Sequence, residues 1–129
     1  MKRLGISTKK RFEFIDITQK VQKEVNNSGK KQGMVFLYVP HTTAGLTINE
    51  NADPSVMRDI THKIQQLVPE GDGYTHAEGN SDSHIQSSVF GSELFFFIED
   101  GRIVTGTWQG IYFCEFDGPR QRELYLKIV

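Results

Sequence analysis

The chain of 129 residues contains one cysteine, one tryptophan and four prolines, and its formal net charge is only −1. A single cysteine, Cys114, excludes an intramolecular disulfide and a zinc site built from several cysteines. No apolar run approaches the roughly 20 residues of a membrane-spanning helix. The basic first residues, M-K-R-L-G-I-S-T-K-K, also lack the apolar stretch of a secretory signal. We therefore expect one soluble, cytoplasmic domain over residues 1–129, with no membrane partner.

The small net charge conceals an uneven distribution. Residues 1–31 hold nine Lys or Arg against three acidic residues, whereas residues 32–129 hold six against thirteen. A basic segment can bind a phosphate backbone. Here the bases are mostly Lys, and Phe12 and Phe14 are the only aromatic residues among them, so a solvated face is the better interpretation. Nucleic acid is disfavoured as a partner.

Hydropathy patterns predict an α+β fold, a single compact domain with an antiparallel-rich, sandwich-like β-sheet and two to three short helices. Ile17, Val21 and Val25 recur at helical spacing, and Ser28-Gly29 ends that helix. Asp53 and Pro54 are favourable residues at the start of a second helix. Asp82 or Ser81 is expected to cap a third helix that runs through Phe90 and is closed by Gly91. Strands are expected at residues 11–17, 33–39, 46–50, 94–98, 102–105, 111–116 and 122–129.

Two of these expectations concern how the strands pack. The apolar run at 33–39 is typical of a strand that is buried on both faces, and the run at 94–98 is expected to be a buried strand. The last four strands follow one another closely, with an Asp-Gly turn at residues 100–101, so they are expected to form an antiparallel meander. The polar stretch 69–83 has little to bury, and a loop of this length inside a compact domain is usually functional or disordered.

Three of the four histidines fall in turns or polar segments. His41 directly follows an apolar strand, and His76 and His84 lie in the polar stretch and its continuation. Each alone is more simply a structural or exposed residue. If the three converge, they resemble a catalytic zinc site with one open position. The spacing matches no local metal signature, and His62 lies off the apolar stripe of its helix as a surface residue.

Carboxylates occur near the same segments. Glu50 and Asp53 flank the start of the second helix. Glu115 shares a strand face with Ile111 and Phe113, and a buried carboxylate must be paired, protonated or bound to a metal. Two interpretations of Glu115 are about equally favoured. It pairs with Arg120 or Arg122, or it has a role in a functional site. Cys114, on the opposite face, is expected to be a small core residue.

The segment G-T-W-Q-G places Trp108 and Gln109 between two glycines. Trp108 is either a wall for a ring-shaped ligand or a core residue beside a bulge. The turns P-H-T-T-A-G and E-G-N-S-D-S have small polar residues beside glycine, which suits backbone contacts to a phosphate. Neither matches a nucleotide-binding fingerprint.

Four segments in order, H-T-T-A-G-L-T-I-N-E, Y-T-H-A-E-G-N-S-D-S-H, G-T-W-Q-G-I-Y-F-C-E-F and D-G-P-R, resemble the YjbQ-like family, also called the secondary thiamine-phosphate synthase enzyme family. The resemblance implies a compact α+β fold, a homotrimer with polar clefts near subunit interfaces, and a histidine-rich, metal-binding site. It also implies a weak, secondary thiamine-phosphate synthase activity. The motif positions in this chain are His41, Thr42, Thr43, Asn49, Glu50, Asp53, His76, Asn80, His84, Gln109, Glu115 and Arg120.

This activity joins a pyrimidine methyl diphosphate to a thiazole phosphate, and diphosphate leaves. Our hypothesis assigns a divalent metal, zinc before Mg²⁺, to His41, His76 and His84. In this hypothesis Thr42, Thr43 and Arg120 bind the phosphate groups. Trp108 stacks on the pyrimidine ring, and Glu50 or Glu115 binds its amino group. Further candidates are Asp53 for catalysis and Asn49, Asn80 and Gln109 for substrate binding.

Two alternatives remain open at this point. Diphosphate transferases usually use Mg²⁺, which prefers oxygen ligands, whereas three histidines suit zinc. A metal-dependent hydrolase of a phosphorylated small molecule fits that ligand set equally well. A trimeric protein that binds a metal or ligand without catalysis is the third possibility.

Overall fold

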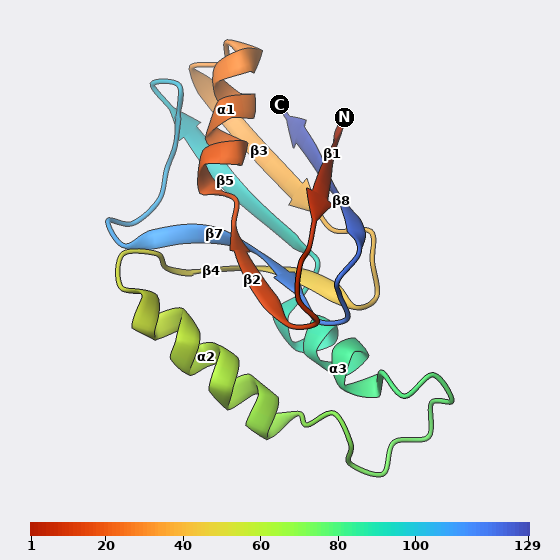
Figure 1. Ribbon diagram of the computed structural model, residues 1–129. Helices are drawn as coiled ribbons and strands as arrows, with labels where there is room; N and C mark the ends of the chain where they lie inside the picture. The colour runs from red at the N-terminus through yellow and green to blue at the C-terminus, as the bar shows by residue number, and fades with distance from the viewer.

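The computed structural model describes residues 1–129 as a single α+β domain with three helices and two antiparallel sheets (Figure 1). The five-stranded sheet has the order β1-β8-β3-β5-β6, and the three-stranded sheet has the order β2-β7-β4. The bounds of its strands are β1 Lys2–Ser7, β2 Glu13–Asp16, β3 Gln32–Tyr38, β4 Ala44–Glu50, β5 Glu93–Glu99, β6 Arg102–Ile103, β7 Gln109–Glu115 and β8 Gln121–Ile128. Both termini lie at one end of the molecule, because β1 and β8 pair antiparallel.

The helices begin and end where the capping residues indicate. Helix α1 (Thr18–Ser28) ends at Gly29 in the left-handed conformation. Helix α2 (Pro54–Leu67) begins after Asp53, whose carboxylate accepts a hydrogen bond from the amide of Ser55 at 2.9 Å. Helix α3 (Ser81–Phe90) ends at Gly91 as predicted, but its N-cap is Asn80 and not Ser81 or Asp82. The Asp100-Gly101 turn has positive φ at both residues, as a tight hairpin requires. The predicted cap at Asp53, the helix ends at Gly29 and Gly91, and the Asp-Gly turn are confirmed.

The hydrophobic core lies between the two sheets and is closed at one end by α1. One cluster of 15 buried residues draws on both sheets and on the Ile17, Val21 and Val25 stripe of the first helical segment. The predicted face of Glu115 is also confirmed, because it shares the core side of β7 with the buried Ile111 and Phe113. Cys114 is buried on the other side, where burial raises the pKa of its thiol well above the ordinary value.

The expected meander of the last four strands is wrong. Strand β5 pairs with β6, but β7 crosses to the other sheet between β2 and β4, and β8 returns between β1 and β3. The expected opening strand is β2, and the basic segment before it forms β1 at a sheet edge. Pairing of β1 with β8 joins the two ends of the chain, and no local pattern in the sequence indicates it.

The expectation that residues 33–39 are buried on both faces is wrong for the single chain, and the strand at 94–98, expected to be buried, is buried on one face only. Val35 and Leu37 are buried, whereas Phe36 and Tyr38 are 42% and 50% exposed. On β5, Phe96 and Ile98 are buried, whereas Phe95 and Phe97 are 54% and 55% exposed. Since β3 and β5 are neighbours, the four exposed rings form one surface, which we call the aromatic face. Nothing within the chain covers it.

Helix α2 packs loosely. Its apolar stripe is present, but none of its residues is fully buried, and it lies outside the three-stranded sheet (Figure 1). His62 is exposed on this helix, as expected. No helix in the structure has the length and apolar character needed to cross a membrane.

Replacing Phe113 by Ala should lower the free energy of unfolding by about 3–5 kcal/mol, because the ring is fully buried between the sheets. Urea unfolding followed by circular dichroism measures the change. Trp108→Ala is the matched aromatic control: its side chain is 63% exposed, so its effect should stay within about 0.5 kcal/mol. Equal losses in both variants would contradict this placement of the two rings.

Candidate functional site

The three candidate histidines come from different elements and border two adjoining hollows. One hollow, of about 590 Å³, is lined by Gly73, Tyr74, Thr75, His76, Ser81, His84 and Ile85. The other, of about 470 Å³, is lined by His41, Thr42, His84, Ser87, Ser88, Gly91, Ser92 and Glu93. His84 lines both, so the fold brings the three histidines around one region. We call the two hollows together the histidine cleft.

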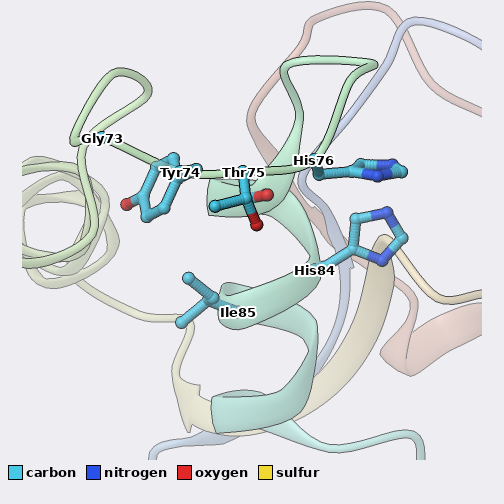
Figure 2. A pocket seen from close by; sticks show the side chains of 7 residues that line it. Gly73, Tyr74, Thr75, His76, His84 and Ile85 are labelled. Carbon is cyan, nitrogen blue, oxygen red and sulfur yellow. The ribbon is translucent and has the colours of Figure 1, made fainter.

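His76 and His84 form the closest pair in this cleft. His76 lies on the loop after α2, and His84 projects from α3 toward it (Figure 2). Their ring centroids are 5.4 Å apart and the rings are nearly perpendicular, at 88°. Glu78 lies on the same loop, with its Oε1 4.0 Å from His76 Nε2. No three His, Cys, Asp or Glu side chains are close enough together to hold a metal ion as the side chains stand.

His41 is held by the backbone of β8. Its Nε2 accepts a hydrogen bond from the amide of Glu123 at 2.9 Å. Burial lowers the pKa of His41 below its ordinary value, and the nearby positive charge of Arg122 adds to the effect. The ring is therefore favoured in its neutral form. A neutral imidazole has only one lone pair, and here the Glu123 amide occupies it.

A buried ion pair lies close behind His41. Arg122 donates from Nε to both oxygens of Glu115 at 3.0 Å. Its Nη2 donates to the hydroxyl and the carbonyl of Thr43, at 2.8 and 3.1 Å. Thr8 completes the set by donating to Glu115 Oε1 at 2.7 Å. The pairing of Glu115 with Arg122, one of the two interpretations of this carboxylate, is thus present, and both oxygens of Glu115 are engaged.

A second set of charges fixes the start of α3. Arg11 binds both oxygens of the buried Asp82, at 3.0 and 3.1 Å, and this hydrogen bonding raises the pKa of Arg11. Asp117 accepts from Arg120 at 3.1 Å and from Asn80 at 2.8 Å. The Oδ1 atom of Asn80 is buried and has no hydrogen-bond partner in the chain. Asn80 and Arg120 therefore lie at the base of the helix that carries His84.

The remaining predicted site residues lie elsewhere. Asn49 and Glu50 are at the far end of β4, where Glu50 pairs with Gln109 of β7. Glu115 is at the other end of β7, so the two ends are roughly 20 Å apart at the rise of a β-strand. Asp53, Trp108 and Gln109 belong to this distant end, where Gln109 accepts from the amide of Gly106 at 2.7 Å. Hydrogen bonds from Ser55 lower the pKa of Asp53.

Several residues of the cleft were not among the sequence candidates. Tyr74 and Thr75 line the cleft and directly precede His76. Their position next to this motif histidine could have predicted that they belong to the site. Glu93 and the serines of α3 carried no such signal. Arg11 belongs to the basic N-terminal segment, and only the tertiary contact with Asp82 sets it apart from the other bases.

The fold and the cleft are those of a small α+β protein with three histidines that border two hollows. The chain belongs to the YjbQ family: the family model described as UPF0047 protein YjbQ-like matches residues 2–129. It is 53% identical to the UPF0047 protein of Methanocaldococcus jannaschii, over 96% of this chain and 90% of that protein. It is 48% identical to YugU of Bacillus subtilis, over 100% of this chain and 98% of that protein.

Solved structures of the family share the whole fold. A crystal structure of a YjbQ/UPF0047 protein from Clostridium acetobutylicum matches with a TM-score of 0.97 and 49% identity, over 100% of both chains. A YbjQ-like protein from Sulfolobus solfataricus matches with a TM-score of 0.93 and 34% identity, over 98% of this chain and 94% of that one. The family resemblance read from the four motifs is therefore confirmed.

Arg122→Leu should destabilise the protein by about 3–5 kcal/mol, because it leaves the fully buried Glu115 without a partner. The double variant Glu115→Leu/Arg122→Leu should recover much of this loss, since it removes both charges. Urea unfolding of the wild type, both single variants and the double variant measures the coupling between the two residues. Additive losses would show that the pair is not the source of the effect.

Proposed function

We propose that this protein is an enzyme that acts on a phosphorylated small molecule in the histidine cleft. The proposed reaction is the transfer that the family resemblance implies: the C–O bond of a pyrimidine methyl diphosphate breaks, diphosphate leaves with the electron pair, and the thiazole nitrogen bonds to the methylene carbon. The observation that supports the proposal is that His84 lines both hollows, one of them together with His76 and the other together with His41.

The charges around the cleft bear on how a phosphate group would be held. The three guanidinium groups here are already paired, since Arg11 binds Asp82, Arg120 binds Asp117 and Arg122 binds Glu115. Glu78 and Glu93 add exposed negative charge near the cleft. A phosphorylated substrate therefore needs an additional cation.

A divalent metal is the proposed source of that charge. The edge-to-face rings of His76 and His84 suit two ligands of one ion, with Glu78 nearby as an oxygen ligand. Imidazole ligands favour zinc over Mg²⁺, which prefers oxygen. When bound, such an ion would stabilise negative charge on a leaving phosphate or diphosphate. The hydroxyls of Thr42, Thr75 and Ser81 line the cleft as hydrogen-bond donors to phosphate oxygens.

Hydrolysis of a phosphorylated small molecule is the second candidate, and one observation favours it. Trp108 was proposed to stack on the pyrimidine, with Glu50 or Glu115 at its amino group, but Trp108 and Glu50 lie at the far end of β4 and β7, and both oxygens of Glu115 are engaged. A single chain therefore offers the histidine cleft no tryptophan against which that ring could stack. Transfer needs two organic substrates to meet in the site, whereas hydrolysis needs only one and a water molecule.

A homotrimer remains part of the proposal, and the aromatic face supports self-association. Four large aromatic side chains, Phe36, Tyr38, Phe95 and Phe97, are exposed on adjacent strands. Exposed apolar patches of this kind mark interaction surfaces. The unbroken apolar runs of β3 and β5 are those of strands covered on both sides, and a second copy of the chain would provide the missing cover.

Zinc-loaded wild-type protein should convert a pyrimidine methyl diphosphate and a thiazole phosphate into the coupled product, with release of diphosphate. His84→Ala should abolish this turnover and the bound zinc, since His84 borders both hollows. Chromatography of the products and elemental analysis measure the two effects.

The same assay separates the alternatives. Release of inorganic phosphate without coupled product would establish the hydrolase. No turnover of either kind by a zinc-loaded wild type would favour a binding protein. The exposed His62→Ala variant is the matched control and should keep both zinc and activity. Loss of the folded state in His84→Ala, seen by circular dichroism, would assign the histidine a structural role.

Light scattering of the purified protein should give about three times the 14.7 kDa of one chain. Phe95→Glu should shift the mass toward that of one chain, because it places a charge in the middle of the aromatic face. Leu67→Glu, at an exposed apolar residue on α2, should leave the mass unchanged. A wild type that runs as a single chain would refute the trimer.

A further inference from the structure

We infer that His41 is a fixed hydrogen-bond donor to the substrate, through Nδ1–H, and not a ligand of the metal. This inference rests on the proposed function for its substrate, but its structural part concerns the ring of His41 alone. The observation that carries it is the hydrogen bond from the Glu123 amide to His41 Nε2, at 2.9 Å. It divides the three histidines into a pair and a single residue with a different role.

The position of His41 follows from the end of the β3–β8 ladder. Strand β3 ends at Tyr38, which pairs with Tyr125, and two residues further along the same register Pro40 would face Glu123. The chain turns away at Pro40, so the Glu123 amide has no strand carbonyl on that side. Backbone amides of a strand end must find another acceptor, and the imidazole of His41 takes this place.

The consequence for the ring is a choice of tautomer. In a neutral imidazole one nitrogen carries the proton and the other carries the lone pair. Since Nε2 accepts from the amide, the proton of His41 is on Nδ1. Nδ1 makes no hydrogen bond within the chain, and it is not fully buried. His41 therefore presents an N–H donor and no free lone pair to the cleft.

A metal ligand needs the opposite arrangement, because the ion binds the lone pair. Coordination through Nε2 would break the bond to Glu123. Coordination through Nδ1 would place a proton on Nε2, facing the amide proton of Glu123. Neither conflict exists for His76 and His84, because the bond from Glu123 to His41 is the only hydrogen bond within the chain that involves a histidine ring nitrogen.

The substrate atom that suits His41 is an oxygen acceptor. The hollow beside His41 has no hydrophobic lining and no cationic side chain. The hydroxyls of Ser87, Ser88 and Ser92 in it donate to Ala44, His84 and Glu93, so those protons are used within the chain. Nδ1–H of His41 is then an available donor for an ester, carbonyl or phosphate oxygen of the substrate.

Nitrogen-15 NMR of the imidazole rings tests the inference directly. The metal-free protein is measured at a pH above the ordinary histidine pKa of about 6.5, and the His41 signals are identified by their loss in His41→Gln. We expect the Nδ1–H tautomer. Added zinc should shift the ring nitrogens of His76 and His84 and leave those of His41 in place.

The outcomes separate this inference from the proposed function. An Nε2–H tautomer in the metal-free protein, or a His41 signal that shifts with those of His76 and His84, would overturn the assignment. If zinc shifts no histidine, the proposed metal site fails, whereas an Nδ1–H tautomer of His41 would still support the donor role.

Two variants of His41 provide a matched pair. The side-chain amide of Asn reaches the position of Nδ1 and retains a donor there, whereas that of Gln reaches the position of Nε2 and retains only the acceptor for Glu123. Zinc binding, measured by calorimetry, should persist in both and disappear in His84→Ala. Turnover should fall about 10²-fold in His41→Gln and less in His41→Asn. Loss of zinc from both variants would identify His41 as a ligand.

Discussion

The buried pair of Glu115 and Arg122 is the interaction on which the rest of this structure depends. Glu115 belongs to the three-stranded sheet and Arg122 to the five-stranded sheet, so the pair joins the two layers at one end of the core. Thr8 and Thr43 satisfy further hydrogen-bonding groups of the pair. A buried charge pair is tolerated only when its partners are complete. Its completion here fixes the segments after β1 and before β4, and the latter segment includes His41.

The cleft beside this pair shows how charge balance limits the possible chemistry. The arginines near the cleft are Arg11, Arg120 and Arg122, and each is paired with a carboxylate. They are therefore not free to bind a phosphate group, and the exposed acidic residues nearby add negative charge. In the proposed function, the histidines therefore bind the phosphate group, either through a metal or through their N–H groups. In the proposal, His76 and His84 bind the ion and His41 donates to a substrate oxygen. The reason is that the amide of Glu123 already occupies the lone pair on His41 Nε2.

The aromatic face and the distant residues around Trp108 show that the single chain leaves two surfaces unexplained by its own packing. The apolar runs of β3 and β5 correctly indicated strands, but their outer rings remain uncovered. Glu50 and Gln109 are motif positions of the family, and Trp108 precedes Gln109, yet the β4–β7 ladder holds all three far from the histidines. The exposed rings are the observation on which the proposed homotrimer rests.

Local signals in the sequence determined the helices, the cap at Asp53, the helix ends at Gly29 and Gly91, the Asp-Gly turn and the core side of β7. These depend on side-chain periodicity and on backbone preferences of Asp, Pro and Gly within a few residues. The four motifs also identified the family. Strand order was not determined in this way, because β1 pairs with β8 and β7 lies between β2 and β4 through contacts distant in the chain. Only the tertiary structure decided that Glu115 pairs with Arg122, that Arg11 holds Asp82, and that the lone pair of His41 belongs to the amide of Glu123. Each of these depends on the register of strands or loops that meet only after folding, and no spacing along the sequence encodes that register.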